Sequence, residues 1–342
     1  MNSKLKMAIV GAGLWGLNHG RIYRAHPFCE LVAVCDKNRS AAERVANQLG
    51  CTKVYDDYRE MMKDGGFDAV AIVTPDFAHA DIAICAAAAR KHMLIEKPLA
   101  TTREDVHAII DAVEKNSVRV MVDLHNRWNP PFNAAWEAIR RDELGEVYSA
   151  YYRLNDVKWV ATDMLSWAAQ SSILWFLGTH SLDTLRWIFG DEVKRVYSVS
   201  REGILQGLGV DTTDMYLTTL EFKKGGIAQM ENGWVTPNAN PCVNDIKFTV
   251  LGTKGMISID ASSHNLIQQY TDHAVKVPDV LVQNSIFTMP KGFAFESIRT
   301  FADRMLDGED FPVGLEDAAN TSLALLAVME SAKTRTPVEV VY

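Results

Sequence analysis

The chain has 342 residues, of which 48% are hydrophobic and 23% are charged. This length exceeds one ordinary hydrophobic core, so we expect a globular protein with two domains. The formal net charge of −8 argues against nucleic acid or an anionic membrane as a partner, because both require clustered positive charge. A small molecule is the more natural partner.

The amino-terminal segment and the cysteines bear on the compartment. The opening MNSKLKMAIVGAG has too short an apolar run for a signal peptide, and no window reaches the roughly 18 unbroken apolar residues of a membrane span. We therefore expect a cytoplasmic protein. The cysteines form no C-x-x-C pair and show no ligand spacing with the histidines, so we expect reduced thiols and no metal site.

Residues 5 to about 126 alternate short apolar runs with amphipathic segments of helical length. The runs are LKMAIVGAG, LVAVCD, DAVAIVTP, HMLIEKP and RVMVDLHNR, with KVYDD as a weaker sixth. Apolar strands separated by helices are typical of a parallel sheet covered on both faces. We therefore predict an α/β domain over residues 1–125.

After residue 126 the pattern changes to short segments in which apolar and polar residues alternate. They are GEVYSAYYRL, VKRVYSVS, TDMYLTTLEF, GIAQMENGW, DIKFTVLG, GMISID and NLIQQY. This alternation predicts an open, mostly antiparallel sheet, interrupted by one helix at about 171–189. Two helical patterns near 298–305 and 323–327 and the strand TPVEVV close the chain. We assign residues 126–342 to the second domain, although the last helices could pack on either one.

The segment GAGLWG has the spacing of a dinucleotide-binding loop. Gly11, Gly13 and Gly16 follow the first strand and open a helix. The first glycine permits a tight turn, the second lets the backbone approach a pyrophosphate, and the third allows close helix packing. The helix start, which includes Leu14 and Trp15, offers N–H groups to the anion. These five residues are our candidate cofactor loop.

Asp36 ends the second strand, about 20 residues after the glycines, where a carboxylate can accept hydrogen bonds from the adenosine ribose. Its charge would repel the 2′-phosphate of NADP, so we expect NAD. Lys37 and Arg39 could offset that repulsion, so NADP stays possible.

The stretch HMLIEKPLATT begins as an apolar strand and ends on Glu96 and Lys97. Charged groups at the end of a buried strand lie on the rim of the sheet, where α/β enzymes place their chemistry. Lys97 is therefore a candidate active-site residue. The alternative is a surface salt bridge followed by a helix-starting proline.

Four motifs in order, GAGLWG, VTPDFAHADIA, EKP and LGTHSLDTLRW, resemble the Gfo/Idh/MocA family of sugar and inositol oxidoreductases. The resemblance covers nearly the whole chain. It implies an N-terminal Rossmann dinucleotide-binding domain and a C-terminal domain built on an open, mostly antiparallel β-sheet. Thr74, Pro75 and His79 match the family's T-P-x-x-x-H turn, which borders the cofactor.

The family's E-K-P motif is matched by Glu96, Lys97 and Pro98. The resemblance implies that Lys97 points at the substrate beside the nicotinamide and that the Lys97–Pro98 bond is cis. A lysine there could donate a hydrogen bond to the substrate oxygen as charge develops on it. This assigns a function to the charged end of the strand.

The family's second-domain helix often reads D-x-G-x-H-x-x-D, and its first Asp and its His complete a catalytic triad with the lysine. Here Gly178, His180 and Asp183 are retained, but Phe176 stands in the place of the first carboxylate. His180 can act as general base for a hydroxyl proton. Asp183, three residues on, could orient His180 or contact a substrate hydroxyl.

Asn126 and Arg127 follow the sixth strand at the domain junction and could bind substrate oxygens, or they could be solvated loop residues. The tryptophans could stack on a sugar face, but most tryptophans are core residues, so we expect at most one ligand contact among Trp159, Trp167, Trp175 and Trp234.

These features predict an NAD(P)-dependent dehydrogenase or reductase that acts on a secondary hydroxyl of a sugar, sugar derivative or cyclitol, with no metal. One alternative is an NAD-dependent glycosidase that oxidises its substrate transiently. The other is a non-catalytic NAD-binding regulator. Family members commonly associate through the open face of the sheet, so we expect a homodimer or homotetramer.

Overall fold

The computed structural model describes residues 4–262 and 266–342, which form two compact units. The first unit comprises residues up to 125 and 281–322, and the second comprises 126–280 and 323–342. Residues 281–322, which we had placed in the second domain, thus lie with the first unit. Among them, Ser297 donates a hydrogen bond to Asp123 at 2.5 Å, and the Arg304 carbonyl accepts one from Arg119 at 3.1 Å. These pairings between distant segments are not visible in local sequence patterns.

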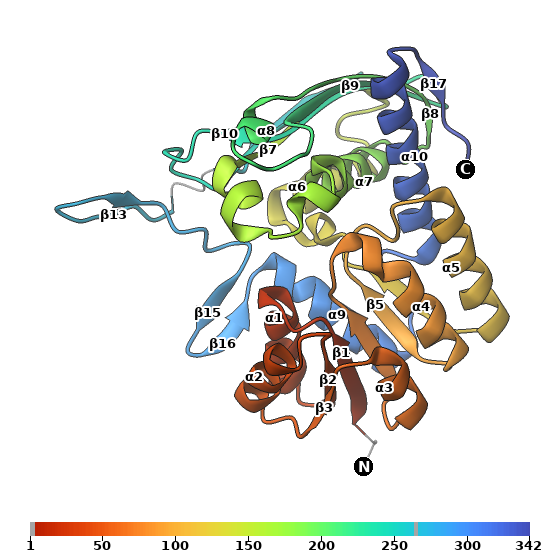
Figure 1. The fold of residues 1–342 in the computed structure, drawn as a ribbon. Coiled ribbons are helices and arrows are strands. Elements are labelled where there is room, and N and C mark those ends of the chain that lie inside the picture. Colours follow the sequence, from red (N-terminus) through yellow and green to blue (C-terminus); the bar gives the residue numbers. More distant parts are fainter. Residues whose placement is uncertain (1–3, 263–265) are drawn as a thin grey trace. The chain divides into compact units, whose positions relative to one another are not determined.

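The first unit contains a six-stranded sheet in the order β3-β2-β1-β4-β5-β6, with every pair parallel. Its strands are β1 (Leu5–Val10), β2 (Cys29–Cys35), β3 (Lys53–Tyr55), β4 (Ala69–Ile72), β5 (His92–Ile95) and β6 (Val120–Val122). This order is that of a Rossmann sheet, and it confirms the predicted α/β fold. All six carboxyl ends therefore lie at one edge (Figure 1).

Helices connect the strands of this sheet. They are α1 (Leu14–Ala25), α2 (Arg39–Leu49), α3 (Tyr58–Asp64), α4 (His79–Ala88) and α5 (Arg103–Asn116). The side chains of Asn38, Asp57 and Thr102 cap α2, α3 and α5 by accepting backbone N–H hydrogen bonds. A later helix, α9 (Phe293–Asp307), belongs to the same unit and buries Ile298 and Phe301. The periodicity near 298–305 had predicted this helix.

The second unit contains a seven-stranded sheet in the order β12-β11-β7-β10-β9-β8-β17. Its strands are β7 (Val147–Val157), β8 (Val193–Arg201), β9 (Met215–Phe222), β10 (Ile227–Thr236), β11 (Asn244–Gly252), β12 (Met256–Asp260) and β17 (Val338–Glu339). Five of the neighbouring pairs are antiparallel, and β10 and β7 are parallel. The mostly antiparallel sheet is thus confirmed, with one parallel pair that the sequence did not reveal.

One face of this sheet forms the core of the second unit. There the ring centroids of Phe132, Tyr152 and Phe248 lie 5.4–5.5 Å from one another. The same core includes buried residues of α6 (Pro130–Arg140), α7 (Thr179–Phe189) and the later part of α10 (Leu315–Thr334). The predicted helix at 171–189 is α7, preceded by a π-helical turn at Leu174–Gly178.

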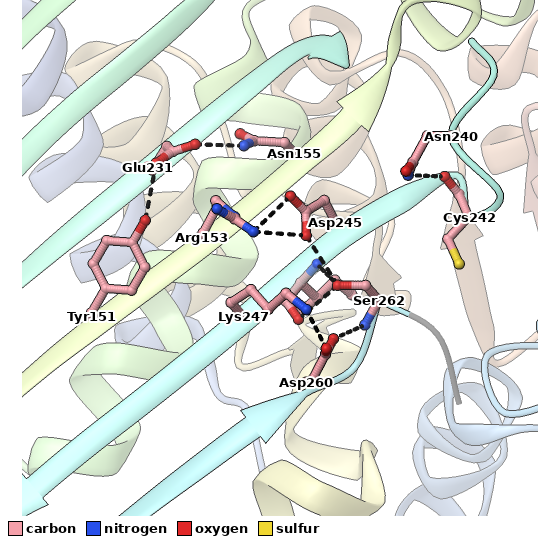
Figure 2. Close-up of polar contacts among 11 residues, drawn as sticks. Tyr151, Arg153, Asn155, Glu231, Asn240, Cys242, Asp245, Lys247, Asp260 and Ser262 are labelled. Atoms are coloured by element: carbon pink, nitrogen blue, oxygen red, sulfur yellow. Dashed lines mark hydrogen bonds and ion pairs between the residues drawn. The ribbon is translucent and has the colours of Figure 1, made fainter. Parts of the chain in front are cut away.

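The opposite face of the sheet carries paired polar side chains, as Figure 2 shows. Glu231 accepts hydrogen bonds from Tyr151 and Asn155, and Arg153 pairs with Asp245. Cross-strand register places Leu217, Glu231, Arg153 and Lys247 on neighbouring strands in one row. This face is therefore the predicted solvated face.

Two short hairpins follow the sheet. The predicted strand NLIQQY contributes only β13 (Gln269–Tyr270), which pairs with β14 (Val275–Lys276), and Asn265 lies outside the described residues. The second hairpin, β15 (Asn284–Ile286) with β16 (Met289–Lys291), belongs to the first unit. Within residues 4–262 and 266–342, no helix is long and apolar enough to cross a membrane.

Candidate active site

The three glycines of GAGLWG serve different needs at the β1–α1 turn. Gly11 has φ = +107°, and a Cβ there would lie 2.3 Å from the carbonyl oxygen of Val73. A Cβ on Gly16 would lie 1.9 Å from the carbonyl oxygen of Gly11. A Cβ on Gly13 would meet no described atom within 4 Å. Gly11 and Gly16 are thus required by the fold itself, whereas Gly13 leaves open space before the start of α1 that suits an approaching pyrophosphate.

The two residues between these glycines differ in exposure. Leu14 is 66% exposed, while Trp15 is half-buried. The Trp15 ring lies 6.3 Å from the rings of His125 and Phe295, measured between centroids. Trp15 therefore anchors the first turn of α1 to α9, and Leu14 remains available to a ligand.

Asp36 lies just after β2 and is tied to the glycine loop. Its Oδ2 accepts a hydrogen bond from the Ala12 N–H at 2.7 Å, and its Oδ1 accepts one from the Asn38 N–H at 2.8 Å. Each carboxylate oxygen can accept a further hydrogen bond, so the ribose hydroxyls of a dinucleotide can still bind. Arg39, the basic residue that could offset the charge of Asp36, pairs with Glu43 and Asp56.

The turn after β4 holds Thr74, Pro75 and His79. The Thr74 hydroxyl is buried and has no hydrogen-bond partner in the described part of the chain, so it can serve a bound ligand. Pro75 precedes a short 3-10 turn that leads into α4. His79 is fully buried, with its Nε2 3.0 Å from the Thr74 carbonyl oxygen and its Nδ1 2.7 Å from that of Pro98. Both ring nitrogens of His79 therefore contact the protein backbone.

Lys97 follows β5 at the carboxyl edge of the sheet, as the sequence predicted. The Lys97–Pro98 peptide bond is cis, and the Lys97 side chain is half-buried. Glu96 is buried, and its Oε1 lies 3.0 Å from Nε2 of His19, a fully buried residue of α1. His19 was not among the predicted site residues, although a histidine three residues after Gly16 on the buried face of α1 was a signal.

Glu96, His19 and Asp123 form a buried cluster, with one potential ligand atom of each within 4.8 Å of the others. By proximity these three residues could hold a metal ion, a possibility that our expectation of no metal site overlooked. Burial alone would raise the pKa of Asp123, but interactions with His125, His19 and Ser297 outweigh it and hold the pKa below 3.8. Asp123 is therefore ionised at neutral pH.

The second unit holds the remaining predicted site residues. Asn126 donates a hydrogen bond to the Tyr152 hydroxyl at 3.0 Å, and both residues are buried. Arg127 forms an ion pair with Asp183, with hydrogen bonds of 2.6 and 3.1 Å. His180 lies three residues before Asp183 on α7 and is 7% exposed. Burial raises the pKa of Tyr152 far above its usual value, so its hydroxyl keeps its proton.

Phe176 lies in the π-helical turn before α7, in an aromatic environment. Its ring centroid is 6.4 Å from those of Trp167 and Trp234. Trp175 and Trp234 are core residues, whereas Trp159 and Trp167 are half-buried. Only the last two could therefore contact a ligand from their present positions.

Comparison with known proteins gives family matches in both halves of the chain. Residues 5–124 match the model of the oxidoreductase family with an NAD-binding Rossmann fold, and residues 132–258 match the GFO/IDH/MocA C-terminal domain. Scyllo-inositol 2-dehydrogenase (NAD(+)) of Bacillus subtilis is 29% identical over 269 residues, covering 77% of this chain and 76% of its own. Levoglucosan dehydrogenase of Pseudarthrobacter phenanthrenivorans is 29% identical over 299 residues, covering 77% and 75%.

Among solved structures, scyllo-inositol dehydrogenase from Lactobacillus casei with bound NAD(H) and scyllo-inositol has a TM-score of 0.83. The match covers 98% of this chain and 99% of the other, at 18% identity, and so establishes a shared fold. Both domain models, the Rossmann strand order and the glycine loop agree. The chain therefore belongs to the Gfo/Idh/MocA family and is an NAD-binding oxidoreductase.

Proposed function

We propose that the protein catalyses NAD-dependent oxidation of a secondary hydroxyl on a cyclitol or sugar derivative, or the reverse reduction. The observation that carries this proposal is the arrangement at the carboxyl edge of the first sheet. The open space at Gly13, the buried Thr74 hydroxyl and Lys97 follow β1, β4 and β5, which are adjacent strands. The proposed nucleotide site and the amine of Lys97 would thus lie at the same edge of the first sheet. The curated relatives named for scyllo-inositol and levoglucosan support the substrate class.

The proposed mechanism assigns a role to each chain residue. Bound NAD would supply the hydride acceptor for the carbon that carries the hydroxyl. Lys97 donates a hydrogen bond to the substrate oxygen and stabilises the charge that develops on it. His180 acts as general base and removes the hydroxyl proton as hydride leaves the carbon. The products are a ketone, a protonated His180 and reduced cofactor, so protons and electrons balance.

Asp183 and Arg127 form an ion pair, so we propose that they act as a unit. Arg127 fixes the Asp183 carboxylate on the same face of α7 as His180, because residues three apart on a helix are neighbours. In this role the pair shapes the substrate site next to the proposed base. Asn126, whose amide nitrogen is engaged by Tyr152, stays a predicted substrate contact through its remaining polar atom.

We also propose a homo-oligomer formed through the solvated face of the second sheet, and we keep the cytoplasm as the predicted location. The cross-strand rows of this face contain exposed apolar side chains, with Leu217 47%, Tyr197 43% and Ile227 49% exposed. The same face of a second copy of the chain could cover these residues, and the polar network of Figure 2 would then form the polar rim of the interface. Sedimentation of Leu217→Lys against wild-type protein tests this assembly: a smaller species is expected.

The enzymatic proposal is tested by NADH formation from NAD with a panel of scyllo-inositol, myo-inositol, levoglucosan, aldoses, uronates and glycosides. Lys97→Ala should lower kcat/KM at least about a hundredfold, the range of positioned acid–base and electrostatic groups. Lys63→Ala, which removes an exposed lysine of α3 in the same unit, is the matched control. Release of a sugar without NADH would favour the transient-oxidation glycosidase. NAD binding with no turnover on the panel would favour the regulator.

A further inference from the structure

The turn that carries Lys97 is held by a buried histidine on each side. On the preceding side, the Glu96 carboxylate contacts Nε2 of His19 at 3.0 Å. On the following side, the Pro98 carbonyl oxygen contacts Nδ1 of His79 at 2.7 Å. Both histidines are fully buried, and they come from different helices, α1 and α4. Lys97 thus lies between two anchored neighbours.

Both ring nitrogens of His19 contact polar groups in the interior of the unit. Its Nδ1 lies 3.3 Å from the Tyr23 hydroxyl. Burial, together with nearby acidic groups, raises the pKa of Tyr23 well above its usual value, so the hydroxyl keeps its proton and can donate it to Nδ1. The imidazole hydrogen is then on Nε2 and is donated to the Glu96 carboxylate. This chain fixes the direction of the Glu96 side chain from the interior of the unit.

The contacts of His79 have a different requirement. Both partners, the carbonyl oxygens of Thr74 and Pro98, can only accept hydrogen bonds. The His79 ring lies within hydrogen-bond distance of both carbonyl oxygens, and its tautomer decides which of them accepts a hydrogen bond. The ring joins the loop after β4 to the turn after β5, the two segments that border Lys97 and the proposed cofactor site.

We propose that His19 and His79 are positioning residues for Lys97: they hold the Glu96 side chain before it and the Pro98 carbonyl after it, and so define where its ammonium group lies. A lysine side chain is flexible, and a misplacement of about 1 Å at a reacting group can lower a rate about a hundredfold. Anchoring both neighbours reduces this freedom. The proposal rests on the proposed function for the chemical role of Lys97. The two contacts, His19 with Glu96 and His79 with Pro98, are called the clamps below, and their effect on Lys97 can be measured without a substrate.

The variants His19→Leu and His79→Leu remove the two clamps one at a time. His19→Gln retains an amide donor for Glu96 and His79→Gln retains one for a carbonyl, so both should restore part of the effect. His26→Leu is the matched control. His26 is buried and its Nε2 contacts the Asp303 carboxylate at 2.9 Å, which is the same chemistry as in the His19–Glu96 pair. It follows the last residue of α1, seven residues after His19 and about 10 Å away.

The readout is the acetylation rate of Lys97 by acetic anhydride in the NAD-saturated protein, measured by peptide mass spectrometry relative to the exposed Lys63. Loss of either clamp should raise this relative rate about tenfold, the effect of roughly one hydrogen bond to a charged group. The Gln variants should give smaller increases and His26→Leu almost none. Calorimetric NAD affinity and thermal unfolding check that each variant is folded.

With a substrate identified by the panel, the two Leu variants should lower kcat and leave KM nearly unchanged. If the Leu variants do not fold, the Gln variants decide the labelling test.

Unchanged Lys97 labelling in folded clamp variants would overturn the inference. So would a stoichiometric divalent metal in the purified wild-type protein that is lost in His19→Leu, because His19 would then be a metal ligand. The two proposals fail separately. Altered labelling in a protein that oxidises nothing on the panel would keep the clamp and reject the dehydrogenase.

Discussion

Arg127 and Asp183 form a buried ion pair in which Nη2 donates to Oδ1 at 2.6 Å and Nε donates to Oδ2 at 3.1 Å. The two side chains are 9% and 1% exposed. Replacing Arg127 with Leu would leave the Asp183 carboxylate buried without its cation. Because an uncompensated buried charge is costly, we expect this variant to lose about 3–5 kcal/mol of the free energy of unfolding of the second unit.

Urea unfolding followed by tryptophan fluorescence measures this loss, because all eight tryptophans except Trp15 lie in the second unit. Arg195→Leu is the control: Arg195 pairs with Glu221 on the same unit, but both side chains are more than 40% exposed. An exposed pair contributes about 0–1 kcal/mol. Equal losses in the two variants would show that burial of the Arg127 pair has no energetic consequence.

The sequence predicted the parts of the molecule that depend on local patterns. Apolar runs and helical spacing located the strands of the parallel sheet, and the glycine spacing located the loop before α1. The order of these elements then put Lys97 at the carboxyl edge. Each of these inferences uses only residues close together in the chain.

The contacts missed by the sequence analysis join distant residues. His19 and Glu96 are 77 positions apart, and Arg127 and Asp183 are 56 positions apart. The placement of α9 against the first unit is of the same kind. An amphipathic helix shows that it has a partner but not which surface that partner offers, so these pairings emerge only in the folded chain.

Asp36 should make the protein selective for NAD. Its carboxylate would lie next to the 2′-phosphate of NADP, and the carboxylates of Glu43 and Asp56 compete with that phosphate for Arg39. We expect calorimetry to show NAD binding at least about 30-fold more tightly than NADP, since juxtaposed like charges cost several kcal/mol. Asp36→Ser should reduce this ratio.

The same substitution should also weaken NAD binding, because Asp36 accepts the N–H hydrogen bonds of Ala12 and Asn38 that hold the loop. Arg39→Ala serves as the control and should leave the NAD to NADP ratio nearly unchanged. A ratio of NAD to NADP affinity that is no smaller in Asp36→Ser than in the wild-type protein would reject this role for the carboxylate.

Phe176 occupies a site that is now built for an aromatic ring. Restoring the family carboxylate with Phe176→Asp would place a charge between Trp167 and Trp234. We expect the free energy of unfolding of the second unit to fall by about 2–4 kcal/mol, through lost packing and a poorly solvated charge, with no gain in kcat. Phe176→Leu, which keeps an apolar side chain, should cost less. A rise in kcat for the Asp variant would instead show that the family triad can be rebuilt here.

Asp123 should stabilise the first unit in a pH-dependent way. Its folded-state pKa lies below 3.8, so its contribution is fully present above the unfolded pKa and disappears as the pH falls through the lower folded value. We expect Asp123→Asn to lose about 1–3 kcal/mol at pH 7, because the buried charged acceptor for Ser297 is removed. The difference from wild type should stay constant down to about pH 5 and shrink below about pH 4.

Opening of the first unit can be followed through Cys29 and Cys35, two free thiols in β2. Burial raises the pKa of each to about 12, so alkylation near neutral pH requires the unit to open. Urea titrations with a pulse of alkylating reagent at each pH give the free energy of opening. In the acidic range, the pH is raised briefly during the pulse, or a reagent that reacts with the neutral thiol is used. Asp111→Asn, on the exposed side of α5, is the control and should differ little from wild type throughout. If the stability difference between wild type and Asp123→Asn instead widens below pH 4, Asp123 is protonated in the folded protein. Its assignment as an ionised carboxylate would then be wrong.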